Sequence, residues 1–77
     1  MSRPELLYYV DGRTAGWVIR CEDQRYGPYT TLQAAVDAAV FEAQAAGQLG
    51  FDSTVLVRNR DHAYEPCWAG GEPLARL

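Results

Sequence analysis

Residues 30–47 constrain the fold more than any other part of the chain, because they have the features of one continuous helix. Thr30 and Gln33 fit a capping box, in which the threonine hydroxyl accepts a first-turn N–H and the glutamine reaches back to the cap. Thr31 is the alternative N-cap. We therefore expect the helix to begin at one of these two threonines.

The residues in the middle and at the end of this segment also favour a helix. Seven alanines lie between Ala34 and Ala46, and alanine loses almost no side-chain entropy in a helix. Gly47, with Gly50 behind it, can adopt the left-handed conformation that commonly ends a helix. The sequence predicts one helix, over about residues 31–47.

The expected helix has an apolar stripe and a separate aromatic flank. At about 100° per residue, one side should pack on a sheet through Leu32, Ala35, Val36, Ala39, Ala43 and Ala46. Phe41 falls on a flank away from this stripe. A helix that is apolar on two sides usually contacts two partners. We expect Phe41 to be covered either by a terminal segment of the same chain or by a second subunit.

β-forming residues before the helix predict a hairpin. Residues 5–11 form the first expected strand, and Asp11 and Gly12 provide turn chemistry at its end. The chain should then return through residues 16–22, where apolar and polar side chains alternate. Such alternation is typical of a strand with one buried and one wetter face.

Further strands are expected on both sides of the helix. Residues 26–29 could form a short third strand, and residues 53–60 and 64–69 form two more after the helix, with Pro66 confining the last to an edge. The predicted fold is α+β: an antiparallel sheet of 4–5 strands in the order β-β-(β)-α-β-β, with the helix on one face.

Length and charge limit the classes of protein to consider. The chain has 77 residues, the size of one domain, and residues 70–77 are expected to be a loosely ordered tail. Its formal net charge of −3 disfavours non-specific binding to nucleic acid, which depends on a basic excess. Arginine supplies every basic side chain and lysine none, a usage typical of GC-rich bacterial genomes.

Nothing in the sequence indicates a membrane protein or an exported one. No apolar run approaches the roughly 20 residues that a membrane-spanning helix needs. The start, Met1–Glu5, lacks the apolar core of a signal peptide. We expect a cytoplasmic protein with no membrane partner.

Residues that carry catalytic or metal-binding chemistry are sparse. His62 is the single histidine and follows Asp61 in an expected turn. Cys21 and Cys67 lack metal-ligand spacing, so reduced thiols packed in strands are the default, although folding could bring His62 and Cys67 together in one hairpin. We expect no enzyme, and no catalytic, cofactor-binding or metal-binding residues.

The sheet face away from the helix is the candidate contact surface. Its expected members are Leu7, Tyr9, Val18, Arg20, Leu56, Arg58 and Arg60, to which Phe41 on the helix flank is added. One helix covers only one face of a single-layer sheet, so the other face stays open unless the C-terminal tail crosses it. A protein contact, a solvated face and a single-stranded nucleic-acid platform are the three interpretations of this surface.

The segment from Leu6 to Arg60 carries a resemblance to small bacterial domains of unknown function. Its marks are Trp17-x-Ile19, Tyr29-Thr30-Thr31 opening a helix with Ala34-Ala35, Ala38-Ala39 and Ala43, and Val55-Leu56-Val57. The layout is also similar to HicB-type antitoxins, in which a strand pair, a helix and another strand bind a toxin. Here residues 23–28 replace the loop of those antitoxins before the helix, and no DNA-binding segment follows.

These features together predict a non-catalytic protein-interaction or accessory module, with a protein partner or a second copy of the chain as its binding partner. A nucleic-acid-binding or antitoxin-like regulator is the alternative. The resemblances imply an architecture and transfer no functional residue to this chain.

Overall fold

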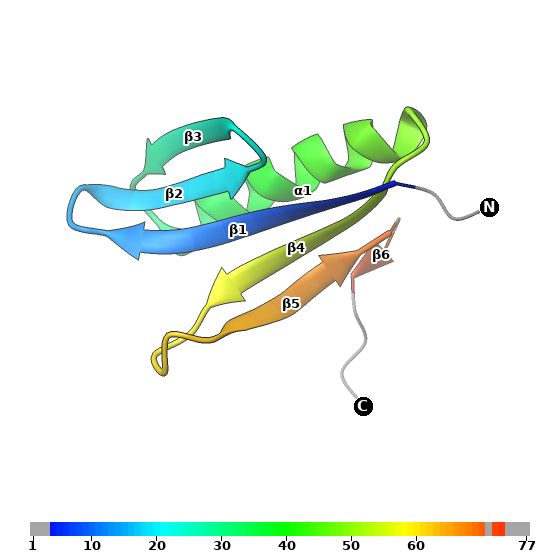
Figure 1. Ribbon diagram of the computed structural model, residues 1–77. Coiled ribbons are helices and arrows are strands. Elements are labelled where there is room, and N and C mark those ends of the chain that lie inside the picture. Colours follow the sequence, from blue (N-terminus) through cyan, green and yellow to red (C-terminus); the bar gives the residue numbers. More distant parts are fainter. Residues whose placement is uncertain (1–3, 71, 74–77) are drawn as a thin grey trace.

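One helix packs on one face of a mixed six-stranded sheet in the computed structural model, which describes residues 4–70 and 72–73 (Figure 1). The elements are β1 (Glu5–Arg13), β2 (Gly16–Cys21), β3 (Gln24–Tyr29), α1 (Leu32–Gln48), β4 (Asp52–Arg58), β5 (Tyr64–Ala69) and β6 (Glu72–Pro73). Their order across the sheet is β3-β2-β1-β4-β5-β6. The predicted α+β class with one helix is confirmed for the described residues.

The two central strands run parallel, so the expectation of a purely antiparallel sheet was wrong. Tyr8 of β1 pairs with Val55 of β4 in a parallel register, whereas every other strand pair is antiparallel. The physical reason is the crossover: α1 carries the chain back over the sheet, so β4 enters beside β1 in the same direction. A parallel pair requires a connection of this kind.

The C-terminal end adds a short pairing that the sequence did not predict. Trp68 of β5 pairs with Pro73 of β6, so residues 72–73 extend the sheet by a two-residue strand. Most of the expected tail over 70–77, namely residues 71 and 74–77, lies outside the described residues.

The first hairpin turns later than the sequence predicted. Its turn is at Thr14 and Ala15, and β1 continues through Asp11 and Gly12 as far as Arg13. The prediction of a turn at Asp11 was therefore wrong. Asp11 can stay in the strand because its carboxylate is paired there with cationic side chains, as described below.

Helix α1 begins at Leu32, directly after Thr31, the second of its two candidate N-caps. The Thr31 hydroxyl accepts a hydrogen bond from the Ala34 backbone N–H at 3.0 Å, so Thr31 and not Thr30 is the N-cap. Gln33 does not complete a capping box; its side-chain amide donates to Asp37 at 2.8 Å. The observed helix lies within one residue of the predicted range at each end.

The core lies between α1 and the sheet, and small side chains bring the two close together. The buried positions of the helix are Ala35, Ala39, Ala43 and Ala46, and they face the sheet side chains Tyr8, Val10, Ile19, Cys21, Val55 and Trp68. Two members of the predicted stripe lie at its rim instead: Leu32 is exposed and Val36 is half-buried. Alanines allow this close approach because their side chains end at Cβ.

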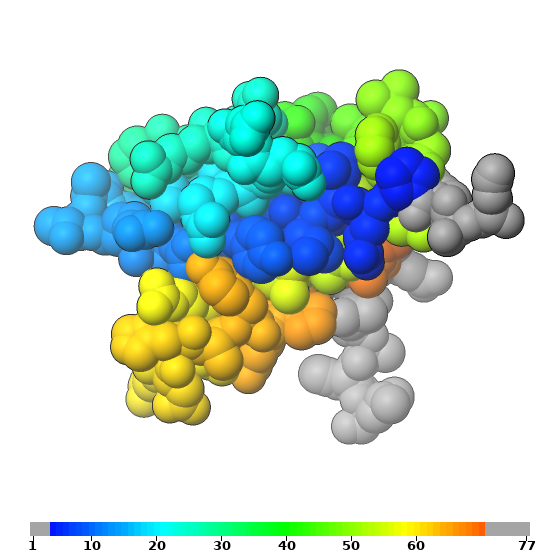
Figure 2. All heavy atoms as spheres, in the orientation of Figure 1, coloured from blue at the N-terminus to red at the C-terminus, as the bar shows by residue number. Residues whose placement is uncertain are grey.

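The helix covers only one face of the sheet. It packs on β4, β1, β2 and β3, and it lies behind the sheet in the view of Figure 1. No helix or strand of the described chain crosses the opposite face, which Figure 2 shows from the front. Among the described residues, no helix is long and apolar enough to cross a membrane.

Candidate functional site

The open face, defined as the sheet face opposite α1, presents alternate residues of neighbouring strands. Tyr9 of β1 is paired on one side with Arg20 of β2 and on the other with Leu56 of β4. Two positions further along β1, Asp11 pairs with Val18. Directly paired residues share a face of a sheet, so these five side chains form one surface.

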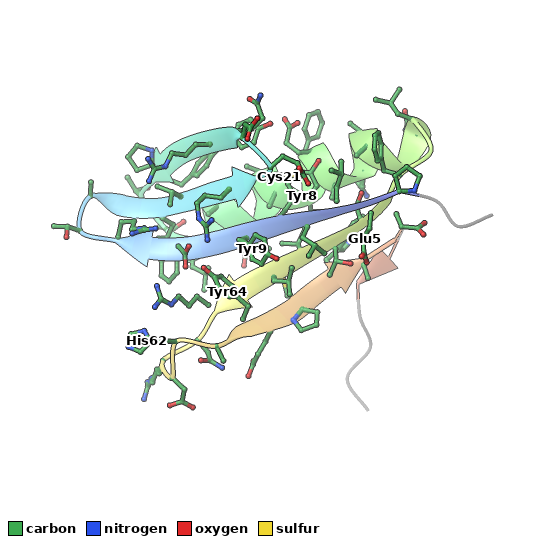
Figure 3. The ribbon with its side chains drawn as sticks, viewed as in Figure 1. Glu5, Tyr8, Tyr9, Cys21, His62 and Tyr64 are labelled. Atoms are coloured by element: carbon green, nitrogen blue, oxygen red, sulfur yellow. The ribbon has the colours of Figure 1, made fainter. Side chains whose placement is uncertain are left out.

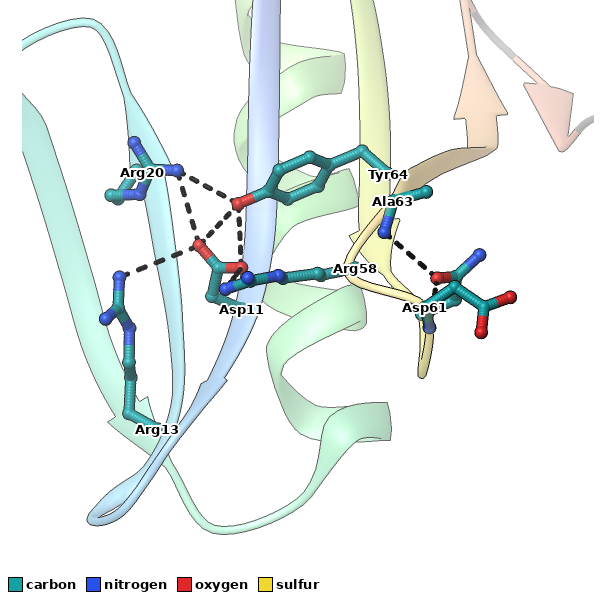
Figure 4. Close-up of polar contacts among 8 residues, drawn as sticks. Asp11, Arg13, Arg20, Arg58, Asp61, Ala63 and Tyr64 are labelled. Carbon is teal, nitrogen blue, oxygen red and sulfur yellow. Dashed lines mark hydrogen bonds and ion pairs between the residues drawn. The ribbon is translucent and has the colours of Figure 1, made fainter.

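The Asp11 carboxylate is the centre of the open face and is buried, although no backbone layer of the described chain lies over it. The Tyr64 hydroxyl lies 2.7 Å from both carboxylate oxygens and donates its proton to them. Arg20 Nη2 donates to Asp11 Oδ2 at 3.3 Å and to the Tyr64 oxygen at 3.1 Å (Figure 4). Side chains, rather than backbone, therefore shield this carboxylate from water.

Two more arginines complete the arrangement. Arg13 Nη2 lies 3.8 Å from Asp11 Oδ2, and Arg58 Nη1 lies 3.8 Å from Asp11 Oδ1. We refer to Asp11, Arg13, Arg20, Arg58 and Tyr64 as the arginine cluster. Three guanidinium groups and one carboxylate give the cluster a net charge of +2, whereas the chain as a whole carries −3. The arginine cluster is thus a locally positive region on an acidic protein, with the carboxylates Glu5 and Glu22 further along the same face.

Aromatic contacts fix the position of Arg20. The rings of Tyr9 and Tyr64 meet edge to face, with centroids 4.9 Å apart and an interplanar angle of 69° (Figure 3). The Arg20 guanidinium carbon lies 5.5 Å from the centre of the Tyr9 ring, within the range of a cation–π interaction. The hydrogen bond with Tyr64, and then the one with Asp11, raises the pKa of Arg20 above its ordinary value, against the opposing effect of burial.

The cluster has more hydrogen-bond donors than acceptors. Each guanidinium carries five N–H groups, whereas a carboxylate offers about four acceptor positions. The side chains of Arg13, Arg20 and Arg58 are 47%, 42% and 37% exposed. The Nε atoms of Arg20 and Arg58 are buried and have no hydrogen-bond partner. The outward N–H groups of these arginines can therefore bind an oxyanion from solution.

The structure places the predicted contact residues in four different settings. Arg20 and Arg58 belong to the arginine cluster. The apolar candidates of the open face are covered to varying degrees by their neighbours: Val18 is buried, and Leu7, Tyr9 and Leu56 are half-buried. The open face is consequently more polar at its exposed surface than the sequence alone indicated.

Two other predicted contact residues lie away from this surface. Arg60 is exposed in the turn between β4 and β5, and it borders a hollow with Gly12 and Trp17. Phe41 is 69% exposed on the flank of α1. It borders an apolar groove between α1 and β5, together with Val36, Val40, Cys67 and Trp68.

Sequence reasoning missed three members of the cluster: Asp11, Arg13 and Tyr64. The available signal was the alternation Leu7, Tyr9, Asp11, Arg13, which continues one face of the strand through the expected turn. Tyr64 carried no signal of its own, because its contact with Asp11 depends on the order of β1, β4 and β5 in the sheet.

The residues considered for catalysis lie outside the arginine cluster. His62 is exposed in the β4–β5 turn, at the far tip of that hairpin in Figure 3, and borders the same hollow as Arg60. Cys67 is an exposed free thiol beside the groove at Phe41, and Cys21 is a buried free thiol in the core. Among the described residues, no group of three His, Cys, Asp or Glu side chains could hold a metal ion.

No family model, no curated protein and no solved structure matches this chain.

Proposed function

We propose that this chain is a non-catalytic interaction module that binds a protein partner through the open face. The single observation that carries this proposal is the combination of an uncovered sheet face with an exposed cationic centre at Arg13, Arg20 and Arg58. Arginine is enriched in protein interfaces, where its planar guanidinium makes directed hydrogen bonds. The half-buried Leu7 and Leu56 add apolar surface beside these arginines.

The internal pairing of the cluster favours a binding role over a catalytic one. A general base or nucleophile needs a free acceptor that faces a substrate. The Asp11 carboxylate is instead buried, and it already accepts hydrogen bonds from Tyr64 and Arg20. The groups left facing solvent are guanidinium N–H donors, which bind and orient anionic groups.

Site-specific photo-crosslinking in cells tests the proposal. A photoreactive phenylalanine analogue replaces Leu56 on the open face or, as the control, Gln48 on the exposed side of α1. Adducts with a discrete protein, formed at position 56 but not at 48 and removed by excess unlabelled chain, support the proposal. Equal adducts at both positions contradict it. Adducts that nuclease digests favour the alternative, a nucleic-acid-binding or antitoxin-like regulator.

Self-association through the flank of α1 is a second candidate function. Phe41 protrudes beside a groove lined by Val40 and Trp68, so a projection and a hollow lie on the same flank. An isologous dimer interface needs this kind of self-complementary surface. Light scattering over a range of protein concentrations distinguishes a dimer from a monomer.

A further inference from the structure

We propose that the arginine cluster is a binding site for the carboxylate groups of an acidic protein segment. This inference rests on the proposed function and names the chemistry of the partner. Its starting point is charge complementarity: the cluster carries +2 on a chain that carries −3, so an acidic segment is attracted to the cluster itself.

Arg20 is held in place before any ligand arrives. Arg20 donates to both Asp11 and Tyr64 and lies over the ring of Tyr9. Ordering a long side chain on binding costs roughly 0.5–1.5 kcal/mol, and a side chain that is already ordered avoids this cost. The buried Asp11 thus orients Arg20 by a hydrogen bond and keeps Arg13 and Arg58 nearby as ion pairs, and the exposed parts of these guanidinium groups remain for a second carboxylate.

The aromatic side chains of the open face are unsuited to nucleic acid. Single-stranded nucleic acids bind by stacking their bases on exposed aromatic rings. Tyr9 is half-buried, with Arg20 over one face of its ring and Tyr64 packed against the ring, so little of it is left for a base to stack on. A protein carboxylate needs only the outer guanidinium N–H groups and no stacking surface.

Acidic residues at one end of the open face also disfavour the binding of long polyanions. Glu5 and Glu22 border a shallow hollow together with Tyr9 and Arg20. These carboxylates repel a long polyanion laid along the strands, whereas a short acidic segment can bind at Arg13 and Arg58 without meeting them. Apolar residues flanking its carboxylates would contact Leu56.

The test is an NMR titration of the full chain at about 0.15 M ionic strength, with the arginine Nε–H signals as the readout. The probe is a blocked hexaglutamate peptide, and the controls are hexaglutamine, inorganic phosphate and a short oligothymidylate. We expect hexaglutamate to shift the Arg13 and Arg58 signals saturably, while hexaglutamine does not. Arg58→Gln should weaken binding about tenfold, because it removes a charge-assisted hydrogen-bonding group.

Arg60→Gln is the matched control, since it removes the same charge from the exposed turn outside the cluster, and it should change the affinity less than about twofold. Arg58→Lys retains the charge but loses the planar guanidinium group that can bind a carboxylate through two N–H groups. An affinity between those of the wild type and Arg58→Gln therefore also supports the site.

Three outcomes overturn the inference: no saturable shift with hexaglutamate, equal losses in Arg58→Gln and Arg60→Gln, or tighter binding of phosphate or oligothymidylate at the same signals. If photo-crosslinking at position 56 succeeds but hexaglutamate does not bind, the proposed protein-binding function is still supported. Only the inference that the partner is acidic is then contradicted.

Discussion

The Tyr64 hydroxyl lies 2.7 Å from both carboxylate oxygens of Asp11, although the two residues are 53 positions apart in the chain. Asp11 is in β1 and Tyr64 in β5, and β4 lies between these strands. The tyrosine side chain therefore reaches across β4 on the open face. This contact links the β4–β5 hairpin to the central strand β1 and brings Tyr64 into the arginine cluster.

Tyr64→Phe should lower the free energy of unfolding by about 1.5–3 kcal/mol, because a hydrogen bond to a buried charged group is lost. Urea denaturation measures the change. Tyr29→Phe is the matched control: its half-buried tyrosine is on β3 and outside the cluster, so its effect should stay within about 0.5 kcal/mol. Equal effects of the two variants would argue against a structural role for the hydroxyl.

Asp11→Asn should destabilise the chain by about 2–3 kcal/mol, since three guanidinium groups lose their shared counter-charge. In the double variant with Tyr64→Phe, the two losses should not add, because the residues contact each other directly. A coupling energy of about 1 kcal/mol is expected from urea denaturation of the four proteins. Simple additivity would mean that the two groups act independently.

Ala39→Leu should destabilise the fold by about 1–3 kcal/mol, because Ala39 is fully buried between α1 and the sheet and has no room for a larger side chain. Ala45→Leu, on the exposed side of the same helix, should change stability by less than about 0.5 kcal/mol. Thermal denaturation of the two variants compares the sites. A tolerated leucine at position 39 would contradict the close packing.

The fold should lose stability in alkaline solution as Tyr8 becomes ionised. Burial, with a smaller contribution from Cys21, raises the pKa of Tyr8 from 10.0 to about 12. A raised pKa means that the folded state retains the proton more tightly, so this stabilisation is complete below pH 10 and is lost between pH 10 and about 12. The loss is on the order of 2 kcal/mol.

Tyr8→Phe should flatten this part of the stability–pH curve, measured by urea denaturation at each pH. Some slope should remain, because burial also raises the pKa of Tyr26 and of the Cys21 thiol. An unchanged slope in the phenylalanine variant would exclude Tyr8 as its source.

Phe41→Ser tests self-association without disturbing the core, because Phe41 is 69% exposed. We expect the wild-type chain to gain mass with concentration in light-scattering measurements and the variant to remain a monomer. Leu49→Ser removes a comparably exposed apolar side chain beyond the helix and should associate like the wild type. A wild-type chain that stays monomeric throughout would remove this second function.

Local signals predicted the helix well because everything that sets its limits is near in sequence. Thr31, the run of alanines and Gly50, which follows the helix with a φ of 99°, act through backbone hydrogen bonds and conformational preferences within a few residues. The expectation that Gly47 ends the helix was wrong, because α1 continues through it to Gln48. The strand of residues 64–69 was likewise predicted with its observed limits. The α+β class followed from the order of these elements.

Long-range relations were harder to predict from the sequence. The parallel pairing of β1 with β4 depends on where α1 returns the chain, and period-two patterning does not report strand direction. Asp11 was assigned to a turn because Asp-Gly is a strong hairpin signal. That signal was overridden by Arg20, on the adjacent strand of the hairpin, and by Tyr64, 53 positions away in the chain, which satisfy the carboxylate within the sheet.

The most direct test of the proposed site is whether Asp11 and Tyr64 hold Arg20 rigid on the open face. Nitrogen NMR of the arginine side chains measures rotation about the Cζ–Nη bonds. We predict slow rotation with separate Nη signals for Arg20 in the wild type, and fast averaged signals for Arg20 in Asp11→Asn. An Arg20 that is already averaged in the wild type, like the exposed Arg60, would contradict a preorganised cluster.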